Sequence, residues 1–451
     1  KEGYETILIN NNPETVSTDF EVADRLYFEP VTVEDVLNVL DAENVTDVIV
    51  QYGGQTAISL VKGLEEAGVN LLGITNDVID ALEDRDLFYK LLDDCDIPHI
   101  PGEMAKDEQE LVQKAKAMGF PLLIRPSYVI GGKGMLTIQN ETELQACLPA
   151  IKASHFPMLI DAYFPGKEAE IDVVADGKDV LIPTIVEHIE KAGVHSGDSY
   201  ALLPAKTVEA AHKEKMVSYA QKIVNKLQYK GIMNIQYVIY NDEVYMLEVN
   251  PRASRTVPVV SKVCNTPLVS LSTQILLGKS LSEISEKLGL LPDPAYTTIK
   301  FPVFSTSKLS GVDPLVGPEM KSTGEGIAIS STIEEAAKKV FHQYVLSKKG
   351  AAEVYINGEA QGLEELAQSA GLTLVKDKEV SEWVKTKEAL LYVSLQPEDK
   401  ESRMSALKHG LMVMTEAETA SLFFQSFQVD EYHVSSLQEW FQKTKKEVTV
   451  S

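Results

Sequence analysis

The stretch that decides the fold is Asn234-Ile-Gln-Tyr-Val-Ile-Tyr-Asn-Asp-Glu-Val-Tyr-Met-Leu-Glu-Val-Asn-Pro-Arg-Ala-Ser-Arg255. Two apolar runs, Asn234–Tyr240 and Val244–Asn250, flank the polar residues Asn241–Glu243, and this pattern predicts a β-hairpin. A three-residue turn would pair Tyr240 with Val244, the residues that border it. The sequence therefore predicts an antiparallel strand pair whose register can be counted outward from the turn.

That register places Gln236 opposite Glu248. Because side chains alternate along a strand, Glu248 and Asn250 are expected on one face, with Leu247 and Val249 on the other. Three oxygen-bearing side chains then converge, and such a set suits Mg²⁺ bridging the phosphates of a nucleotide. The alternative is a solvated hairpin edge.

Two arginines follow the second strand at once, three residues apart. Arg252 and Arg255 can bind a small planar anion through paired N–H groups. On the alternative interpretation they form a salt-bridged tail.

A second segment rich in glycine is Arg125-Pro-Ser-Tyr-Val-Ile-Gly-Gly-Lys-Gly-Met135. Glycines let backbone N–H groups approach phosphate oxygens, and Arg125 or Lys133 adds positive charge. The segment fits neither the Walker loop nor the dinucleotide fingerprint. Taken alone, it is equally typical of an ordinary hairpin turn.

Further polar segments follow predicted strands. The loop Glu187–Ser199 contains His195 and Asp198, which can meet a nucleotide or be satisfied within the loop. Asn11–Asp19 and Gln51–Thr56 lie just beyond strand ends, where ligands bind in open α/β sheets. Each of these two also fits a helix N-cap with turn glycines.

The pattern of predicted elements divides the chain. Strands at Thr6–Ile9, Val48–Gln51 and Asn70–Leu72 alternate with helices at Val33–Ala42 and Thr56–Glu66, which predicts a parallel sheet. From Asp84 to Leu288 hairpins and helices mix, which is typical of an α+β body. After Ser347 strands and helices alternate again, and this predicts a separate α/β domain.

Composition restricts the class of protein. The 451 residues are 44% apolar and carry 42 basic against 67 acidic groups, a formal charge of −25. Such an acidic surface argues against nucleic-acid or anionic-membrane binding. The three cysteines fit no CxxC pattern, and no apolar run is long enough to span a membrane, so a cytoplasmic protein with reduced thiols is expected. Because the chain opens directly into a strand pattern, we expect a piece of a longer protein.

Taken together, Asn12–Asp19, Gln51–Thr56, Arg125–Met135, Val194–Ser199 and Glu248–Arg255 resemble the carbamoyl phosphate synthetase large subunit, specifically its C-terminal, carbamate-phosphorylating half. The resemblance covers Gly3–Thr323 and implies an α/β and α+β fold class. It implies a pre-ATP-grasp domain at residues 1–83 that lacks its first strand, an ATP-grasp domain at 84–290, and its continuation with a connector at 291–346. Residues 347–451 loosely resemble a methylglyoxal-synthase-like regulatory domain.

The resemblance also implies roles, carried over position by position. It implies ATP with Mg²⁺ or Mn²⁺ as cofactors, together with K⁺. The implied sites are phosphate contacts at Arg85 and Arg125, a phosphate-covering loop at Gly131 and Gly132, adenine and ribose contacts at Phe164 and Glu168, a nucleotide lining at Val194, His195 and Ser196, metal ligands at Gln236, Glu248 and Asn250, and carbamate contacts at Arg252 and Arg255.

The family's larger assembly sets further expectations. A glutamine amidotransferase small subunit and an N-terminal synthetase half would be partners, in a higher oligomer. Ornithine-activated members use carboxylates that match Glu190 and Asp198 and a third one at the position of Phe301, so ornithine activation is not expected here. Phosphate loops for UMP are not evident in Leu374–Thr386 or Ser394–Leu407, which favours arginine over pyrimidine synthesis. Two alternatives stay open, namely another ATP-grasp ligase such as a biotin carboxylase, and a non-catalytic fragment.

Overall fold

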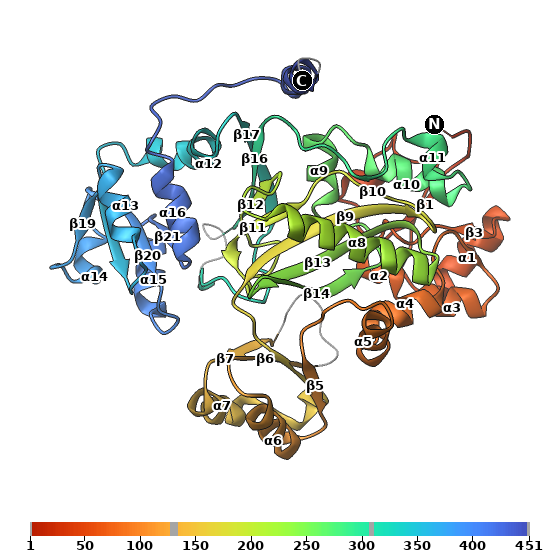
Figure 1. Cartoon of the computed structure of the whole chain (residues 1–451), viewed down its shortest axis with the longest axis horizontal. Helices are drawn as coiled ribbons and strands as arrows, with labels where there is room; N and C mark the ends of the chain where they lie inside the picture. The colour runs from red at the N-terminus through yellow and green to blue at the C-terminus, as the bar shows by residue number, and fades with distance from the viewer. Residues whose placement is uncertain (1, 127–133, 306–310, 449–451) are drawn as a thin grey trace.

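The computed structural model describes residues 2–126, 134–305 and 311–448. Figure 1 shows a central sheet with a small sheet below it, the N-terminal elements at one end and a C-terminal α/β body at the other. Among the described residues, no helix is both long enough and apolar enough to cross a membrane.

The N-terminal region is built from short parallel strand pairs and helices. Its β1–β2 and β3–β4 pairs are both parallel, as predicted, but they form two separate two-stranded sheets rather than one, and β2 is not among the predicted strands. The helix expected at Thr56–Glu66 is two helices, interrupted at Ser59 and Leu60. The elements are β1 (Ile7–Asn10), β2 (Arg25–Phe28), α1 (Val33–Glu43), β3 (Asp47–Val48), α2 (Gly54–Ile58), α3 (Val61–Glu66), β4 (Asn70–Leu71) and α4 (Asn76–Glu83), with a 3-10 turn η1 (Val16–Thr18).

A small antiparallel sheet, in the order β5-β8-β6-β7, follows α5. Two helices cover it and bury a core of its own, which includes Leu111, Leu122 and Ile160. The elements are α5 (Arg85–Asp94), β5 (Gly102–Ala105), α6 (Glu108–Met118), β6 (Leu122–Pro126), β7 (Leu136–Ile138), α7 (Glu141–Cys147) and β8 (Met158–Ala162), with 3-10 turns η2 (Leu148–Ala150) and η3 (Ala153–His155).

The central sheet has nine strands, and its main path runs β14-β13-β9-β11-β12-β16-β17. The β9–β10 hairpin turns at Gly177, whose φ is +94°, as the Asp176-Gly177 pair predicts. The elements are β9 (Lys167–Asp176), β10 (Val180–Ile182), β11 (Val186–Lys191), β12 (Ala201–Leu203), α8 (Ala210–Leu227), β13 (Lys230–Tyr240), β14 (Glu243–Asn250), α9 (Val257–Val263), α10 (Leu268–Leu276), α11 (Leu281–Ile284), β15 (Gly289–Leu290), β16 (Thr297–Val303), β17 (Gly324–Ser330) and α12 (Ile333–Ser347).

The C-terminal region is a parallel sheet in the order β19-β18-β20-β21 with helices around it. Its core includes Leu202 and Ile299 of the central sheet together with α12 and α16, so the two bodies share apolar contacts. The elements are β18 (Glu353–Asn357), α13 (Leu363–Ser369), β19 (Thr373–Val375), α14 (Val380–Trp383), β20 (Ala389–Ser394), α15 (Lys400–Lys408), β21 (Met412–Met414), α16 (Ala417–Gln425) and α17 (Leu437–Val448).

The β13–β14 hairpin corrects the predicted turn. Tyr240 pairs with Glu243 rather than with Val244, because Asn241 and Asp242 form a two-residue turn with φ of 49° and 64°. A register shift between Gln236 and Tyr237 then adds one residue to β14. Gln236 therefore lies opposite Glu248 as predicted, although the predicted turn is wrong.

The same bulge overturns one predicted orientation. Leu247 packs with Val238, Ile100 and Ala192 in a small apolar cluster, while Val249 packs into the main core. Leu247 and Val249 thus do not share a face, since the extra residue reverses the alternation at Leu247.

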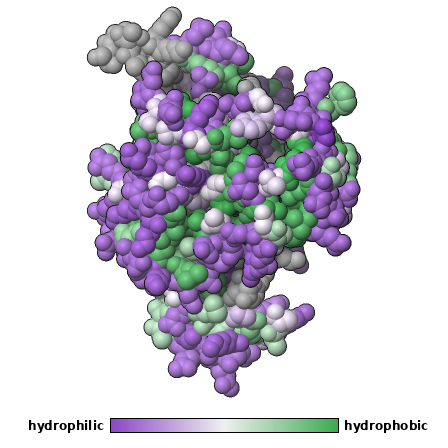
Figure 2. All heavy atoms as spheres, turned by 90° about the vertical axis from the view of Figure 1, so that its right-hand side faces the viewer, coloured by the Kyte–Doolittle hydropathy of each residue, from purple (hydrophilic) through white to green (hydrophobic). Residues whose placement is uncertain are grey.

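Figure 2 presents the side of the molecule that carries the N-terminal elements, where apolar patches lie among polar side chains. Several large apolar residues of this region are exposed, including Phe20 at 95%, Val16 at 77% and Tyr4 at 66%. Contact with another protein surface would bury these side chains.

Candidate functional site

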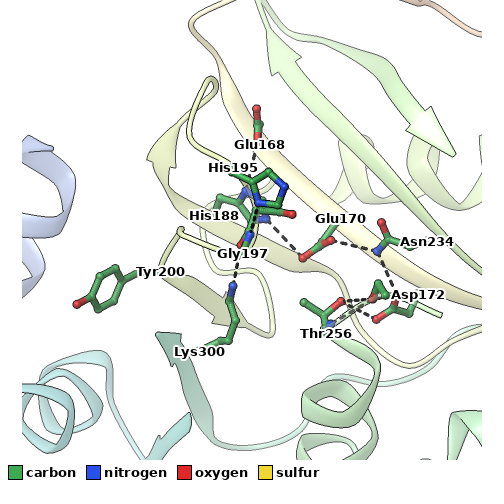
Figure 3. Close-up of polar contacts among 12 residues, drawn as sticks. Glu168, Glu170, Asp172, His188, His195, Gly197, Tyr200, Asn234, Thr256 and Lys300 are labelled. Carbon is green, nitrogen blue, oxygen red and sulfur yellow. Dashed lines mark hydrogen bonds and ion pairs between the residues drawn. The ribbon is translucent and has the colours of Figure 1, made fainter. Parts of the chain in front are cut away.

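One face of the central sheet carries a row of polar side chains. Glu168, Glu170 and Asp172 alternate along β9, so they share a face, and the register sets them beside Val238, Gln236 and Asn234 of β13. Glu248 and Asn250 of β14 continue the row, because they lie opposite Gln236 and Asn234. Figure 3 shows the β9 carboxylates and Asn234 pointing to the same side of the sheet.

The predicted metal ligands are brought together at the outer strand. Asn250 Nδ2 donates to Glu248 Oε1 at 2.8 Å, and the register puts Gln236 directly beside them. Glu248 is exposed, so its carboxylate is open to a ligand. A carboxylate with two amide oxygens is the donor chemistry that Mg²⁺ and Mn²⁺ accept, and these residues therefore fit such an ion.

Glu168 is fixed by a buried histidine. His188 of β11 is 2% exposed, and its Nδ1 lies 3.2 Å from Glu168 Oε2, while its Nε2 lies 3.5 Å from Glu170 Oε1. Burial alone would lower the pKa of His188, but the hydrogen bond to Glu168 and the negative charges of Glu168 and Glu170 outweigh it and raise the pKa to about 9. Against the opposing effect of burial, the imidazolium in turn lowers the pKa of Glu170.

Asp172, deeper on the same face, has a different environment. Its oxygens accept hydrogen bonds from Ser254 Oγ at 2.7 Å, Thr256 Oγ1 at 2.9 Å and Asn234 Nδ2 at 3.1 Å. Burial, with the neighbouring Glu170, raises the pKa of Asp172 to about 7. Asn234 also donates to Glu170 and so ties the two carboxylates together.

The loop with Val194, His195 and Ser196 follows β11, and the Gly193 N–H at its start donates to Glu168 Oε1 at 3.3 Å. Lys300 of β16, fully buried, donates from Nζ to the Ser196 carbonyl at 2.7 Å. Burial lowers the pKa of His195, and Asp198, Glu248 and Arg255 act on it through their charges. Lys300 thus ties this loop to β16 of the same sheet.

Arg85 and Arg125 meet at one carboxylate, Asp161 of β8. The Arg85 guanidinium makes a two-point ion pair with Asp161, and Arg125 Nε lies 4.0 Å from Asp161 Oδ2. Arg85 also lies over the Tyr89 ring, 4.7 Å from its centre. The two predicted phosphate contacts are thus adjacent, and Arg125, with 37% of its side chain exposed, is the more accessible.

Phe164 stands between the small sheet and the central sheet. Its ring stacks on Tyr240 with centroids 4.9 Å apart and meets Tyr245 edge-on at 4.9 Å. The cluster with Leu247 and Val238 makes an apolar wall beside Glu168. Gly131 and Gly132, the predicted phosphate-covering glycines, lie outside the described residues.

Arg252 and Arg255 follow β14, as predicted. Arg252 donates from Nε to Gln55 Oε1 at 3.2 Å, from Nη1 to the Ala253 carbonyl at 3.2 Å and from Nη2 to Asn250 Oδ1 at 3.4 Å. Arg255 is exposed. Arg252 of the predicted anion-binding pair therefore contacts Asn250 of the predicted metal ligands.

Sequence reasoning missed Glu170, Asp172, His188 and Lys300. One signal was available in Glu168-Ala-Glu-Ile-Asp172, where three carboxylates recur at alternate positions before a run of apolar residues. Such a period marks one polar face on a buried strand. No comparable pattern surrounds His188 or Lys300, whose roles depend on strand pairing across the sheet.

Comparison with known proteins identifies these domains. The family model described as "Carbamoyl-phosphate synthase L chain, ATP binding domain" matches residues 84–284, and that described as "Carbamoyl phosphate synthase preATP-grasp domain" matches residues 1–81. The carbamoyl phosphate synthase arginine-specific large chain of Geobacillus stearothermophilus is 56% identical over 450 residues, which cover 99% of this chain and 43% of that protein. The protein of the same name from Bacillus subtilis is 47% identical over 426 residues, covering 94% and 41%. The chain thus spans less than half the length of these relatives.

Solved structures with similar folds are ATP-grasp enzymes. The biotin carboxylase domain of Hydrogenobacter thermophilus 2-oxoglutarate carboxylase, in complex with MgADP, ADP and bicarbonate, has a TM-score of 0.60 at 18% identity and covers 76% of this chain and 84% of that chain. The ADP complex of N5-carboxyaminoimidazole ribonucleotide synthetase has a TM-score of 0.60 at 14% identity, covering 76% and 91%. At such identities the likeness shows the ATP-grasp fold alone. With pre-ATP-grasp and ATP-binding domains matched in order, the chain belongs to the carbamoyl phosphate synthase large-chain family.

Proposed function

We propose that this chain transfers the γ-phosphoryl group of ATP to carbamate, the last step of glutamine-dependent carbamoyl phosphate synthesis. One observation carries the proposal. Glu248 and Asn250 share the polar sheet face with Gln236, and Arg252 and Arg255 follow within five residues. A metal-ligand set next to a two-arginine anion site is what phosphoryl transfer to a small anion requires.

Each part of the face has a place in this reaction. Gln236, Glu248 and Asn250 would hold Mg²⁺ or Mn²⁺, which neutralises phosphate charge when bound. Arg85 and Arg125 would contact the phosphates, and Glu168 would contact the ribose beside the apolar wall of Phe164. Val194, His195 and Ser196 would line the nucleotide. The predicted loop at Gly131 and Gly132 would cover the phosphates.

Arg252 and Arg255 would hold carbamate in line with the γ-phosphorus. A carbamate oxygen attacks phosphorus, the bond to the β–γ bridging oxygen breaks, and ADP leaves. No covalent intermediate with the protein is required, so catalysis consists of positioning and charge neutralisation. Carbamate decomposes in water, which is why a closed site serves this chemistry.

We extend the proposal to the pathway and the partners. The arginine-specific large chains of Geobacillus stearothermophilus and Bacillus subtilis support a role in arginine synthesis. A glutamine-hydrolysing small subunit and a bicarbonate-phosphorylating half would supply carbamate. The exposed apolar residues near Phe20 support contact with such a partner region.

Ornithine activation is not part of the proposal. Phe301 packs over Gly326 within an apolar cluster, so no carboxylate stands there. Glu190 accepts hydrogen bonds from Thr419 Oγ1 and the Tyr200 N–H, and Asp198 accepts them from the Lys321 and Ser322 N–H groups. Both remaining carboxylates are therefore already satisfied by the protein.

The test is the reverse reaction, in which ADP and carbamoyl phosphate give ATP in the presence of Mg²⁺. Replacing Glu248 by Ala removes the charged metal ligand and should slow ATP formation at least ~100-fold, the scale of losing a charge-stabilising group. Glu214→Ala, an exposed glutamate on α8, is the matched control and should leave the rate unchanged. Luciferase-coupled detection of ATP measures both.

The assay is run on this chain and on the full-length large chain, in potassium and in sodium buffers. EDTA should abolish ATP formation, and Mg²⁺ or Mn²⁺ should restore it. Ornithine should leave the rate unchanged. If neither protein forms ATP although both are folded, the proposed function is wrong; biotin-dependent carboxylation would then favour the biotin carboxylase alternative.

A further inference from the structure

The motif Gln51–Thr56 of the N-terminal region lies directly against the arginine loop Pro251–Thr256. The Ala253 N–H donates to the Gln51 carbonyl at 2.9 Å, and Arg252 Nε donates to Gln55 Oε1 at 3.2 Å. These contacts join residues about two hundred positions apart in sequence. The family resemblance gives this motif no chemical role, and its contact with Arg252 indicates what that role is.

Gln51 is the anchor of this contact. Its side chain is fully buried and donates from Nε2 to Tyr229 Oη at 3.0 Å and to the Lys230 carbonyl at 3.1 Å. Its Oε1 accepts from the Ile232 N–H at 3.3 Å. With three partners on β13 and the residue before it, Gln51 fixes the motif to the strand that carries Gln236.

Gln55 is held at both ends of its amide. Its Oε1 accepts from Arg252, and its Nε2 donates to Glu83 Oε1 at 2.8 Å. Because Glu83 accepts only, the amide oxygen is the end that faces Arg252. Gln55 therefore presents a fixed acceptor to the guanidinium.

The opposite side of the arginine loop is held by Asp172, which accepts hydrogen bonds from Ser254 and Thr256. The loop is thus attached to β9 through Asp172 and to the N-terminal region through Gln51 and Gln55. The loop is therefore held on both sides, by the Ser254 and Thr256 hydroxyls and by the Ala253 N–H, and the direction of the Arg252 side chain depends on its own hydrogen bonds.

Two of the five N–H donors of Arg252 remain available for a ligand once its contacts with the described residues are counted. A guanidinium has five N–H groups, one on Nε and two on each terminal nitrogen. Gln55, Ala253 and Asn250 take one each from Nε, Nη1 and Nη2. One N–H remains on each terminal nitrogen, and two such donors match the two oxygens of a planar carboxylate-like anion.

We propose that Gln55 is a positioning residue for the phosphoryl acceptor, through which the N-terminal region sets the orientation of Arg252. The inference rests on the proposed function. By holding Nε, Gln55 turns both terminal nitrogens toward the anion. We expect it to act on the anion, because within the described part of the chain its side-chain hydrogen bonds go to Arg252 and Glu83 and not to a residue assigned to the nucleotide.

Gln55→Ala should raise the KM for carbamoyl phosphate about 10-fold in the reverse reaction, the scale of one hydrogen bond to a charged group. The KM for ADP should stay within two-fold of the parent value. Gln113→Ala, an exposed glutamine on α6, is the matched control and should change neither. A residue needed only for folding would move both KM values or neither.

A paired substitution tests the orientation itself. Gln55→Glu alone places two carboxylates together, because Glu83 faces the amide, and should raise the KM for carbamoyl phosphate. Combining Gln55→Glu with Glu83→Gln exchanges donor and acceptor, keeps an oxygen facing Arg252 and should restore the KM to within about three-fold of the parent value. Failure of this rescue overturns the assigned role.

A calorimetric titration with carbamoyl phosphate, without ADP, separates this inference from the proposed function. Gln55→Ala should weaken binding about 10-fold, because binding does not need turnover. Equal affinities overturn the inference even if the enzyme is active. If carbamoyl phosphate binds neither the parent chain nor its full-length counterpart, the inference is overturned together with the proposed acceptor. If it binds in a Gln55-dependent way without ATP formation, only the proposed function fails.

Discussion

His188 is a buried cation between two carboxylates, and its charge is therefore part of what stabilises the sheet. Glu168 and Glu170 raise its pKa to about 9, against an ordinary value of 6.5. A group whose pKa is raised by folding contributes stability that is complete below its unfolded pKa. That stability is lost as pH rises through the folded pKa, here between about 6.5 and 9.

His188→Gln should therefore change the pH dependence of unfolding. The free energy of unfolding of the parent chain exceeds that of the variant most at pH 6, and the gap should narrow by roughly 3 kcal/mol by pH 9. Urea unfolding at several pH values measures it. His433→Gln, at an exposed histidine, serves as control, and a gap that is constant with pH would contradict the assigned ion pairs.

The predicted metal ligands lie on neighbouring strand positions for a simple reason. Gln236, Glu248 and Asn250 lie on two strands joined by a short turn, so counting along the chain is enough to bring them together. His188 and Lys300 reach the same face only through β11 and β16, whose partners are chosen by the packing of the whole sheet. Local patterns carry no information on that choice.

At the scale of the element, Gln236 lies opposite Glu248 as predicted because two differences between the predicted and the observed hairpin cancel. The turn is one residue shorter than predicted, and a bulge restores the offset before Gln236. The bulge lets Leu247 join the apolar cluster with Val238, which gives a packing reason for it. Strand identities and helix positions were predictable because they follow from periodicity, whereas a bulge depends on contacts with other elements.

Gly231, near the start of β13, should resist substitution. Its φ is +110°, and a Cβ built there would lie 1.9 Å from Gln51 Oε1, so Gly231→Ala must displace the buried Gln51. Loss of the Gln51 hydrogen bonds, together with backbone strain at position 231, should lower the free energy of unfolding by about 2–4 kcal/mol, which chemical denaturation measures. Gly68→Ala is the control, because Gly68 has φ of +81° with open space around it and should cost only about 1 kcal/mol. Equal losses in both variants would contradict a role for Gln51.

At the scale of the whole molecule, the segment 311–322 connects the C-terminal region to the loop that carries His195. Gly317 accepts from the His195 N–H at 2.8 Å, and Asp198 accepts from the Lys321 and Ser322 N–H groups at 2.8 Å. At its other end, Asp313 receives two 2.8 Å hydrogen bonds from the fully buried Arg403 of α15. The C-terminal region thus supports the loop that carries His195 through one continuous set of polar contacts. These contacts join distant parts of the sequence, so no single stretch of sequence predicts them.

Breaking the Arg403–Asp313 pair tests that connection. Arg403→Met leaves Asp313 unpaired beside buried groups, and loss of one partner of a buried ion pair costs about 3–5 kcal/mol. The fluorescence of Trp383, which is fully buried in the C-terminal core, reports this unfolding in a Trp440→Phe background. Adding Asp313→Leu removes the unpaired charge and should recover most of the loss. Lys376→Met, which breaks the exposed ion pair with Glu364, is the control and should cost at most about 1 kcal/mol.

Because the segment 311–322 supports His195, Arg403→Met should also raise the KM for ADP. An unchanged KM in the destabilised variant would show that the connection does not reach the loop that carries His195.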